Sequence, residues 1–188
     1  MNRLMRIDCP VCHTKKSLEV ISHIEKIPYF GEIMESTLIC HECGYRYSDV
    51  LCLDHGDPMR YSLDVESETL NARVVKSQSA TIRIPELGLK VEPGPRSTAY
   101  ISNIEGVIER FQAAVKTALK LFEDEKAQER SLKLLEDLER VRSGEKKVKV
   151  IVEDPMGQSF IAHPRVSKRK LTDAEIKKLK TGFITIER

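Results

Sequence analysis

Cys9-Pro10-Val11-Cys12 and Cys40-His41-Glu42-Cys43-Gly44 are the two stretches that decide the first part of the fold. Two residues between paired cysteines let one tight turn present both sulfurs, and zinc prefers four thiolates in a tetrahedron at about 2.3 Å. Gly44 leaves the backbone free to complete the second turn. The pattern predicts one structural zinc ion held by Cys9, Cys12, Cys40 and Cys43. Four protein ligands leave no position for water, so we expect this zinc to support the fold and not to catalyse.

Other residues that bind metals or act as nucleophiles form weaker patterns. His13 and His41 lie beside the cysteine pairs and are alternative ligands, but four cysteines already complete the set. The five histidines form no His-x-His or His-Glu-x-x-His pattern, so a catalytic metal site has no support in the sequence. No conspicuous base accompanies Cys52, which we expect to pack as a small hydrophobic side chain.

The segment between the cysteine pairs alternates between apolar and polar residues, as half-buried strands do. One predicted strand places Leu18, Val20, Ser22 and Ile24 on one face, and a second places Ile33, Glu35, Thr37 and Ile39 on one face. Residues 26–31 are the turn between them, and residues 45–53 are a possible third strand. Residues 1–53 are therefore predicted to be a zinc-ribbon zinc finger.

Residues 54–188 are predicted to form a β domain that carries a helical insertion. Short strands are expected at 72–76, 80–84, 87–91, 148–153, 159–162 and 183–186. Apolar residues recur at helical spacing from about residue 103 to 143, and the polar patch at 123–126 lets the chain reverse there into a helical hairpin. Thr172 and Glu175 stand at capping-box spacing and predict a short helix over 173–181. The fold class is mainly β with an α insertion.

Charge and hydrophobicity limit the classes of function. No apolar run is long enough to span a bilayer and the N-terminus has no signal-like stretch, so we expect a cytoplasmic protein without membrane contact. Four thiolates and one zinc ion would bring the formal charge from +2 to zero, which gives no overall attraction for nucleic acid. The basic stretch 165–170 remains either a solvated surface or a contact with nucleic acid or a partner.

Several stretches together resemble the ZPR-type zinc-finger proteins, a family of archaea and eukaryotes. They occur in the family order and cover most of residues 9–162: the two cysteine pairs, Ile27-Pro-Tyr-Phe-Gly-Glu32, Arg73-Val-Val-Lys-Ser77, Ala80, Ile84-Pro-Glu-Leu87, Glu105-Gly106 and Asp154-Pro-Met-Gly-Gln-Ser159. Eukaryotic members carry two tandem copies of a zinc finger followed by a β domain. The eukaryotic members have also been linked to growth-factor receptor tails and to nuclear trafficking. This chain has one copy and is similar to the archaeal form. Because archaea have neither such receptors nor a nucleus, the resemblance does not extend these two roles to this chain.

The resemblance implies a fold and a partner. The β domain would be a double-stranded β-helix, a jelly-roll-like fold, with a helical hairpin. The protein would be an adaptor or folding helper that binds the translation elongation factor 1-alpha GTPase. Among the motif residues, Arg73, Lys76 and Glu105 are polar and not obviously needed for packing, so they are candidate partner contacts.

Two other functions stay open at this point. A zinc ribbon with a basic tail could bind nucleic acid, although the near-zero charge and few aromatic residues argue against it. An enzyme in the β domain would need a His-rich metal triad, which the sequence lacks, so we predict no catalytic residues and no enzyme. The sequence does not predict whether the chain is a monomer or a dimer.

Overall fold

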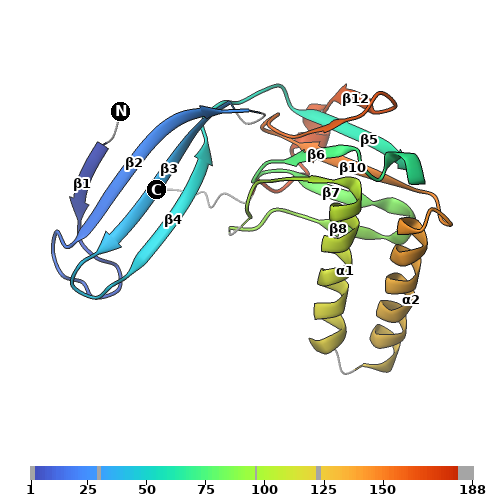
Figure 1. The fold of residues 1–188 in the computed structure, drawn as a ribbon, viewed down its shortest axis with the longest axis horizontal. Coiled ribbons are helices and arrows are strands. Elements are labelled where there is room, and N and C mark those ends of the chain that lie inside the picture. Colours follow the sequence, from blue (N-terminus) through green and yellow to red (C-terminus); the bar gives the residue numbers. More distant parts are fainter. Residues whose placement is uncertain (1–2, 29–30, 96, 122–123, 182–188) are drawn as a thin grey trace. The chain divides into compact units, whose positions relative to one another are not determined.

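The computed structural model describes residues 3–28, 31–95, 97–121 and 124–181 (Figure 1). The chain divides into two compact units, Met1–His55 and Gly56–Arg188. The boundary predicted after Leu53 lies two residues before this one, and Asp54 and His55 belong to the first unit.

The first unit is a four-stranded antiparallel sheet in the order β1-β2-β3-β4. Its strands are β1 (Arg3–Ile7), β2 (Leu18–Ile27), β3 (Gly31–Cys40) and β4 (Arg46–Cys52). The predicted hairpin is therefore present as β2 and β3, which pair over ten positions from Leu18–Cys40 to Ile27–Gly31. Both cysteine pairs lie at one end of this hairpin, directly before β2 and at the end of β3.

The second unit contains two antiparallel sheets, in the orders β12-β5-β10-β7-β8 and β11-β6-β9. Their strands are β5 (Met59–Val65), β6 (Arg73–Lys76), β7 (Thr81–Ile84), β8 (Leu89–Val91), β9 (Tyr100–Asn103), β10 (Val148–Asp154), β11 (Phe160–Ala162) and β12 (Ser167–Lys170). Two short 3-10 turns, Ser67–Thr69 and Pro85–Leu87, connect strands. The arrangement is a jelly roll, as predicted.

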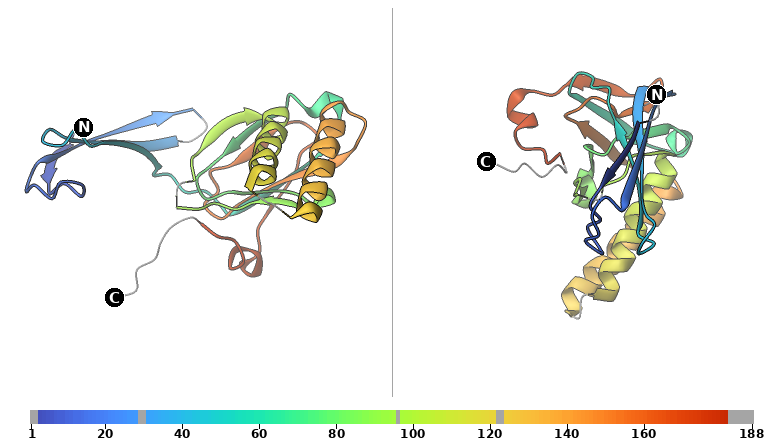
Figure 2. Two further views of the ribbon diagram at one scale, coloured as in Figure 1. Left: turned by 90° about the horizontal axis from the view of Figure 1, so that it is seen from below. Right: turned by 90° about the vertical axis from the view of Figure 1, so that its left-hand side faces the viewer.

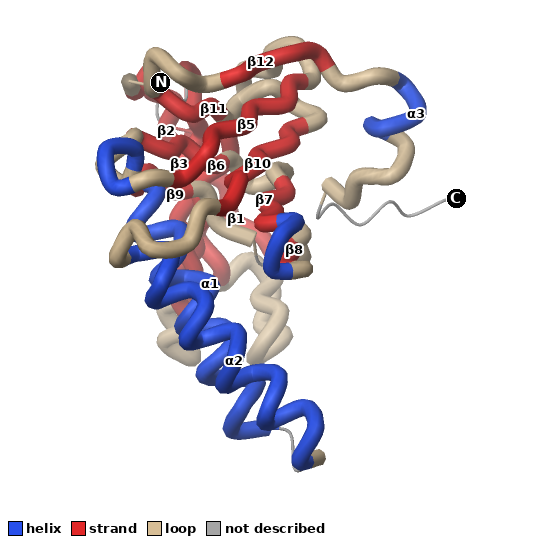
Figure 3. The backbone as a smooth tube through the Cα atoms, turned by 90° about the vertical axis from the view of Figure 1, so that its right-hand side faces the viewer, coloured by secondary structure: helices blue, strands red, loops and turns tan. Residues whose placement is uncertain are grey.

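A helical hairpin of α1 (Ile104–Leu121) and α2 (Glu125–Arg142) extends from the strands of the second unit (Figures 2 and 3). Asn103 caps α1 by accepting a hydrogen bond from the Gly106 backbone N–H at 2.8 Å. A Cβ at Gly106 would lie 2.3 Å from the Ser102 hydroxyl, so a side chain there would require the serine side chain to move. Asp124 caps α2 through the Ala127 N–H at 2.8 Å. None of the described helices is long and apolar enough to cross a membrane.

One apolar core holds the second unit together. It joins the inward sides of both sheets to the apolar stripes of α1 and α2. Its fully buried members include Leu63, Val74, Ile82, Ile84, Ile104, Ile108, Leu138, Val150 and Val152. At roughly 25 cal/mol per Å² of buried apolar surface, this cluster is the main source of stability of the unit.

The C-terminal helix is shorter than predicted. The expected helix over 173–181 ends at Ile176 as α3 (Asp173–Ile176), although the predicted capping box of Thr172 and Glu175 is present. After Lys177 the backbone N–H groups bond three residues back and not four, so the helix closes into a turn. The strand predicted at 183–186 lies outside the described residues.

A buried carboxylate joins two loops of the second unit. Asp154 is fully buried and accepts hydrogen bonds from the hydroxyls of Ser77, Ser79 and Ser159 at 2.8, 2.7 and 2.6 Å. The backbone N–H groups of Met156 and Gln158 also donate to it, each at 2.9 Å. Both carboxylate oxygens are thus satisfied, which offsets the cost of burying the charge. Two motifs 77 residues apart in sequence meet at this carboxylate.

We predict that Asp154→Asn lowers the free energy of unfolding of the second unit by about 3 kcal/mol. The asparagine amide would replace one acceptor oxygen by an NH2 donor, and this donor would face hydroxyl and N–H groups that are donors themselves. Unfolding of the zinc-loaded chain in urea, followed by circular dichroism, measures this loss. Asp57→Asn is the matched control, since Asp57 is exposed and forms an ion pair with the exposed Lys170 at 2.7 Å. We expect the control to change stability by less than about 1 kcal/mol. Equal effects of the two substitutions would contradict the role given to Asp154.

Candidate metal centre

The four cysteine sulfurs form one cluster at the end of the first unit. All four lie within 4.8 Å of one another. The Cys9 and Cys43 sulfurs are 3.7 Å apart, as are those of Cys12 and Cys40. Sulfurs at about 2.3 Å from a tetrahedral zinc ion are about 3.8 Å apart, so the cluster has the dimensions of a zinc site. The predicted ligand set therefore comes together and fits one structural zinc ion.

The two knuckles share one backbone geometry. The residue after each pair, His13 or Gly44, has a positive φ of 58° or 73°. Each donates its N–H to the carbonyl of the first cysteine of its pair, at 2.9 Å for His13 and 3.0 Å for Gly44. His13 thus occupies the place that Gly44 fills in the second knuckle, and its role is in the turn. A left-handed conformation is costly for a residue with a side chain, so the turn must be held by its surroundings.

Electrostatics explain why the cluster needs a cation. The hydrogen bond with the Ser17 hydroxyl, followed by that with the Cys43 backbone, lowers the pKa of Cys40 to about 6. At Cys43 the backbone of Tyr45 lowers the pKa, but burial and the other sulfurs outweigh it and raise the pKa to about 12. The crowded sulfurs therefore cannot all ionise by themselves. A divalent ion makes four thiolates compatible in this space.

The metal cluster is also the core of the first unit. Cys9, Leu18 and Cys40 are its buried apolar group, with Cys12, Leu38 and Tyr45 packed against them. This core is very small beside that of the second unit, so burial contributes little here and the zinc ion has to hold the strands.

The histidines do not join the metal cluster. His41 is exposed and its Nε2 lies 3.4 Å from the Glu19 carboxylate. Among the described residues, the four cysteines are the one group of potential ligands that could hold a metal ion. The alternative in which His13 or His41 replaces a cysteine is therefore unsupported.

One face of the ribbon sheet is apolar and exposed. Side chains of residues paired across strands, and of alternate residues along a strand, share a face. The pairs Met5–Val20, Ile24–Met34 and Met34–Leu51 therefore belong to one face. Five large apolar residues of this face are at least 36% exposed: Met5, Ile7, Ile24, Tyr47 and Leu51. We call these five residues the apolar ribbon face. The pattern of a single strand does not predict this face, because it depends on how the four strands pair.

The opposite face of the same sheet is more polar. It carries Glu19, His23, Glu25, Glu35, Arg46 and Ser48. Val50, which pairs with Glu35, is a large apolar residue of this face that is also exposed, at 40%. The contrast between the two faces indicates that the apolar ribbon face is the surface of the first unit suited to binding another protein.

The three residues predicted as partner contacts lie apart in the second unit. Arg73 is exposed and begins β6, whereas Lys76 ends the same strand and is only 4% exposed. Three residues apart on a strand, their side chains leave on opposite faces. Glu105 is half-buried in the first turn of α1. The structure therefore does not bring them together as one site, and their role as contacts stays a prediction.

The last four residues of the basic stretch 165–170 form the exposed edge strand β12, and most charges of the stretch are paired. Arg165 bonds Glu66 and Glu68 at 3.1 and 2.9 Å. Arg169 pairs with Glu175, and Lys170 with Asp57. These pairs reduce the positive potential that a nucleic-acid surface requires. Charged side chains on an edge strand also discourage pairing with another sheet.

Comparison with known proteins identifies both units. A family profile for the ZPR1 zinc-finger domain matches residues 3–52, and one for the ZPR1 jelly-roll domain matches residues 68–181. A ZPR1-like protein of Pyrococcus horikoshii is 46% identical over 185 residues, which cover 96% of this chain and 83% of that protein. A ZPR1-like protein of Methanocaldococcus jannaschii is 39% identical over 188 residues, 100% of this chain and 95% of its own length.

Eukaryotic relatives are more distant and longer. The zinc finger chaperone zpr1 of Schizosaccharomyces pombe is 27% identical over 162 residues. The match covers 81% of this chain but 34% of that protein. The human relative is named a zinc finger protein, and the fission yeast relative is named a zinc finger chaperone.

We predict that the purified chain holds one zinc ion and that Cys40→Ser loses it, because removing one of four thiolates lowers zinc affinity steeply. Metal analysis after gel filtration, with titration of reactive thiols, measures both. The matched control is His41→Asn, which changes the neighbouring exposed residue and should retain one zinc ion. Loss of zinc in the His41 variant would instead assign that histidine to the metal.

Proposed function

The chain belongs to the ZPR1 zinc-finger protein family, and from that premise we propose that it is a zinc-supported binding protein that assists the folding of a protein client. The client that we propose is the translation elongation factor 1-alpha GTPase, the partner that the resemblance of the sequence implies. The name of the fission yeast relative, a zinc finger chaperone, supports the general role. The proposed place of action is the cytoplasm.

The observation that carries the proposal is the apolar ribbon face. Single exposed apolar residues are normal on a surface, but five share this one face. Met5, Ile7 and Tyr47 lie toward the metal end of the sheet. Ile24 and Leu51 lie toward the other end, beyond the polar row Ser22–Ser36–Asp49. The four strands are five, ten, ten and seven residues long, and at about 3.3 Å per residue and about 4.8 Å between strands they present a face of about 500 Å². This is in the range of patches that mark binding sites for other proteins.

The size of the patch also suggests how the protein would act. A stable complex commonly buries about 800 Å² on each partner, so the ribbon face by itself would give reversible binding. A folding helper has to release its client, and an exposed apolar face favours client states whose own apolar surface is still open. Differential affinity between those states is then enough to assist folding.

The proposed activity is binding and not catalysis. Four cysteines fill the coordination of the zinc ion, so its proposed role is to keep the ribbon sheet in one register. A one-residue slip between β2 and β3 would turn the apolar residues of one strand to the opposite face. The metal therefore determines which surface the client would meet.

We predict that the zinc-loaded chain binds elongation factor 1-alpha of its own organism with micromolar or tighter affinity, and that the affinity differs among its nucleotide-free, GDP-bound and GTP-bound states. Calorimetric titration of the three states measures this. Ile24→Asp, which places a charge on the apolar ribbon face, should weaken binding about tenfold or more.

Val50→Asp is the matched control, because it places the same charge at a similarly exposed apolar residue of the opposite face. It should bind the factor as the unaltered chain does. Equal loss in the two variants would remove the ribbon face from the account. The absence of binding in all three nucleotide states would overturn the choice of client.

A further inference from the structure

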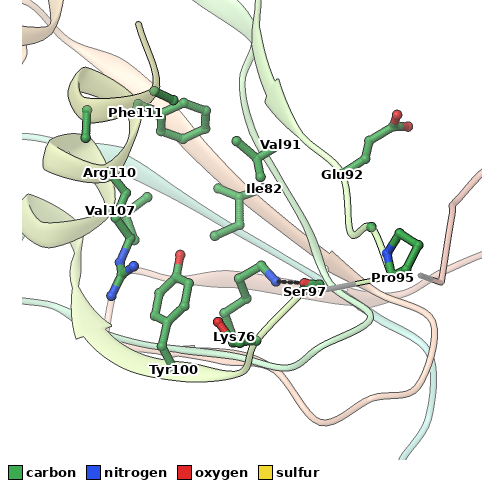
Figure 4. A pocket seen from close by; sticks show the side chains of 14 residues that line it. Lys76, Ile82, Val91, Glu92, Pro95, Ser97, Tyr100, Val107, Arg110 and Phe111 are labelled. Atoms are coloured by element: carbon green, nitrogen blue, oxygen red, sulfur yellow. Dashed lines mark hydrogen bonds between the residues drawn. The ribbon is translucent and has the colours of Figure 1, made fainter. Parts of the chain in front are cut away.

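The second unit contains a pocket of about 820 Å³ that the proposed function does not use (Figure 4). It opens between α1, the strand ends of β6 and β9, and the segment that follows β8. Its volume is within the range of about 300–1,000 Å³ that small-ligand sites occupy. Its apolar wall consists of Ile82, Val91, Val107, Phe111, Ala113 and Ala114.

Lys76 provides a buried positive charge at this pocket. It is 4% exposed, and its Nζ donates to the Ser77 carbonyl at 2.9 Å and to the Ser97 hydroxyl at 3.2 Å. Both acceptors are neutral, and an ammonium group has a third N–H to donate. Buried lysines are almost always paired with an anion. Among the described residues, no carboxylate forms an ion pair with Lys76.

Asp154, which acts electrostatically on Lys76, and Glu92, which lines the pocket, form their hydrogen bonds with other groups. Burial lowers the pKa of Lys76 to about 8; Asp154 opposes this shift, and Arg110 adds to it. The oxygens of Asp154 already accept five hydrogen bonds. Glu92, at the rim, binds Lys180 and Lys90, and its carboxylate points away from Lys76 (Figure 4). Lys76 is thus charged at neutral pH and has no carboxylate in hydrogen-bond contact, although the charge of Asp154 acts on it through space.

Arg110 brings a second cation to the same pocket. Its guanidinium lies 4.1 Å from the centre of the Tyr100 ring and forms no ion pair with a carboxylate of the described chain. The stacking holds the guanidinium in place. Burial raises the pKa of Tyr100, so its hydroxyl is protonated and can donate a hydrogen bond. The Tyr100 hydroxyl points toward Val107 and Ile82, into the pocket (Figure 4).

We propose that this pocket binds a carboxylate attached to an apolar group, with Lys76 and Arg110 holding the carboxylate and the wall of Ile82, Val107 and Phe111 covering the apolar part. Two cations without an anion and a neighbouring apolar wall match the two ends of such a ligand. The same chemistry occurs in a free aliphatic acid and in the C-terminal residue of a polypeptide. The site belongs to the second unit and does not depend on the apolar ribbon face.

Octanoate is the probe that contains both ends of the ligand. Titration of the full zinc-loaded chain, followed by NMR shifts of the Tyr100 and Phe111 rings, should show saturable octanoate binding. Acetate has only the charge and octanol only the chain, so each should bind about tenfold or more weakly than octanoate. Octanol binding as tightly as octanoate, or no saturation by octanoate in the millimolar range, would overturn the proposal.

Substitutions of Lys76 and Arg110 test whether these two side chains bind the carboxylate. Arg110→Gln and Lys76→Met should each weaken octanoate binding about tenfold, since a charge-assisted hydrogen bond is lost. Arg110 is exposed, so its variant keeps the proposal testable even where Lys76→Met disturbs folding. Lys116→Gln on the same helix, outside the pocket, is the matched control and should bind octanoate normally. Equal loss in Lys116→Gln and Arg110→Gln would contradict the assignment.

A pair of peptides distinguishes the two sources of the ligand, a free aliphatic acid and the C-terminal residue of a polypeptide. One ends in leucine with a free carboxylate, and the other has the same sequence with an amidated end. Tighter binding of the free-acid peptide than of octanoate, with loss on amidation, would support a polypeptide C-terminus as the ligand. Binding of octanoate but of neither peptide would support a free acid. A free-acid and an amidated peptide that bind equally well would count against recognition of the carboxylate.

Discussion

Repulsion among four crowded sulfurs is the constraint on which the first unit depends. Only four described residues of the first unit are buried, Cys9, Leu18, Ile33 and Cys40, and two of them are cysteines of the metal cluster. Burial, together with the other three sulfurs, raises the pKa of Cys43 to about 12, which opposes ionisation of all four thiols. A zinc ion removes that opposition and adds a binding free energy of about 10–16 kcal/mol in small zinc peptides. The register of β2 and β3, and with it the apolar ribbon face, follows from the metal.

Buried charge has two different roles in the second unit. Asp154 is completely satisfied by five donors, so it ties two loops together and leaves nothing for a ligand. Lys76, at the end of β6, has only neutral hydrogen-bond acceptors and faces a pocket. The first charge therefore stabilises the fold, whereas the second is held ready for an anion from outside. Burial alone does not distinguish the two roles; the hydrogen-bond partners do.

The sequence predicted what local patterns encode. Paired cysteines predicted the metal ligands, and alternating and helical periodicity predicted the ribbon hairpin, most strands of the jelly roll and the helical hairpin. Features set by contacts between distant segments were missed. The edge strand β12 has the sequence Ser-Lys-Arg-Lys and exists through its pairing with β5. Likewise, no local pattern indicates that Arg110 meets Tyr100 beside Lys76, or which faces of the ribbon strands coincide.

We infer that zinc, and not a packed core, holds the proposed client-binding surface in place, while the second unit folds by itself. Amide hydrogen exchange of the full chain before and after zinc removal tests this inference. We predict that the amides of β2 and β3 lose their protection on zinc removal, while those of β5 and β10 keep theirs. Continued protection of β2 and β3 without zinc, or loss of protection in β5 and β10, would contradict it.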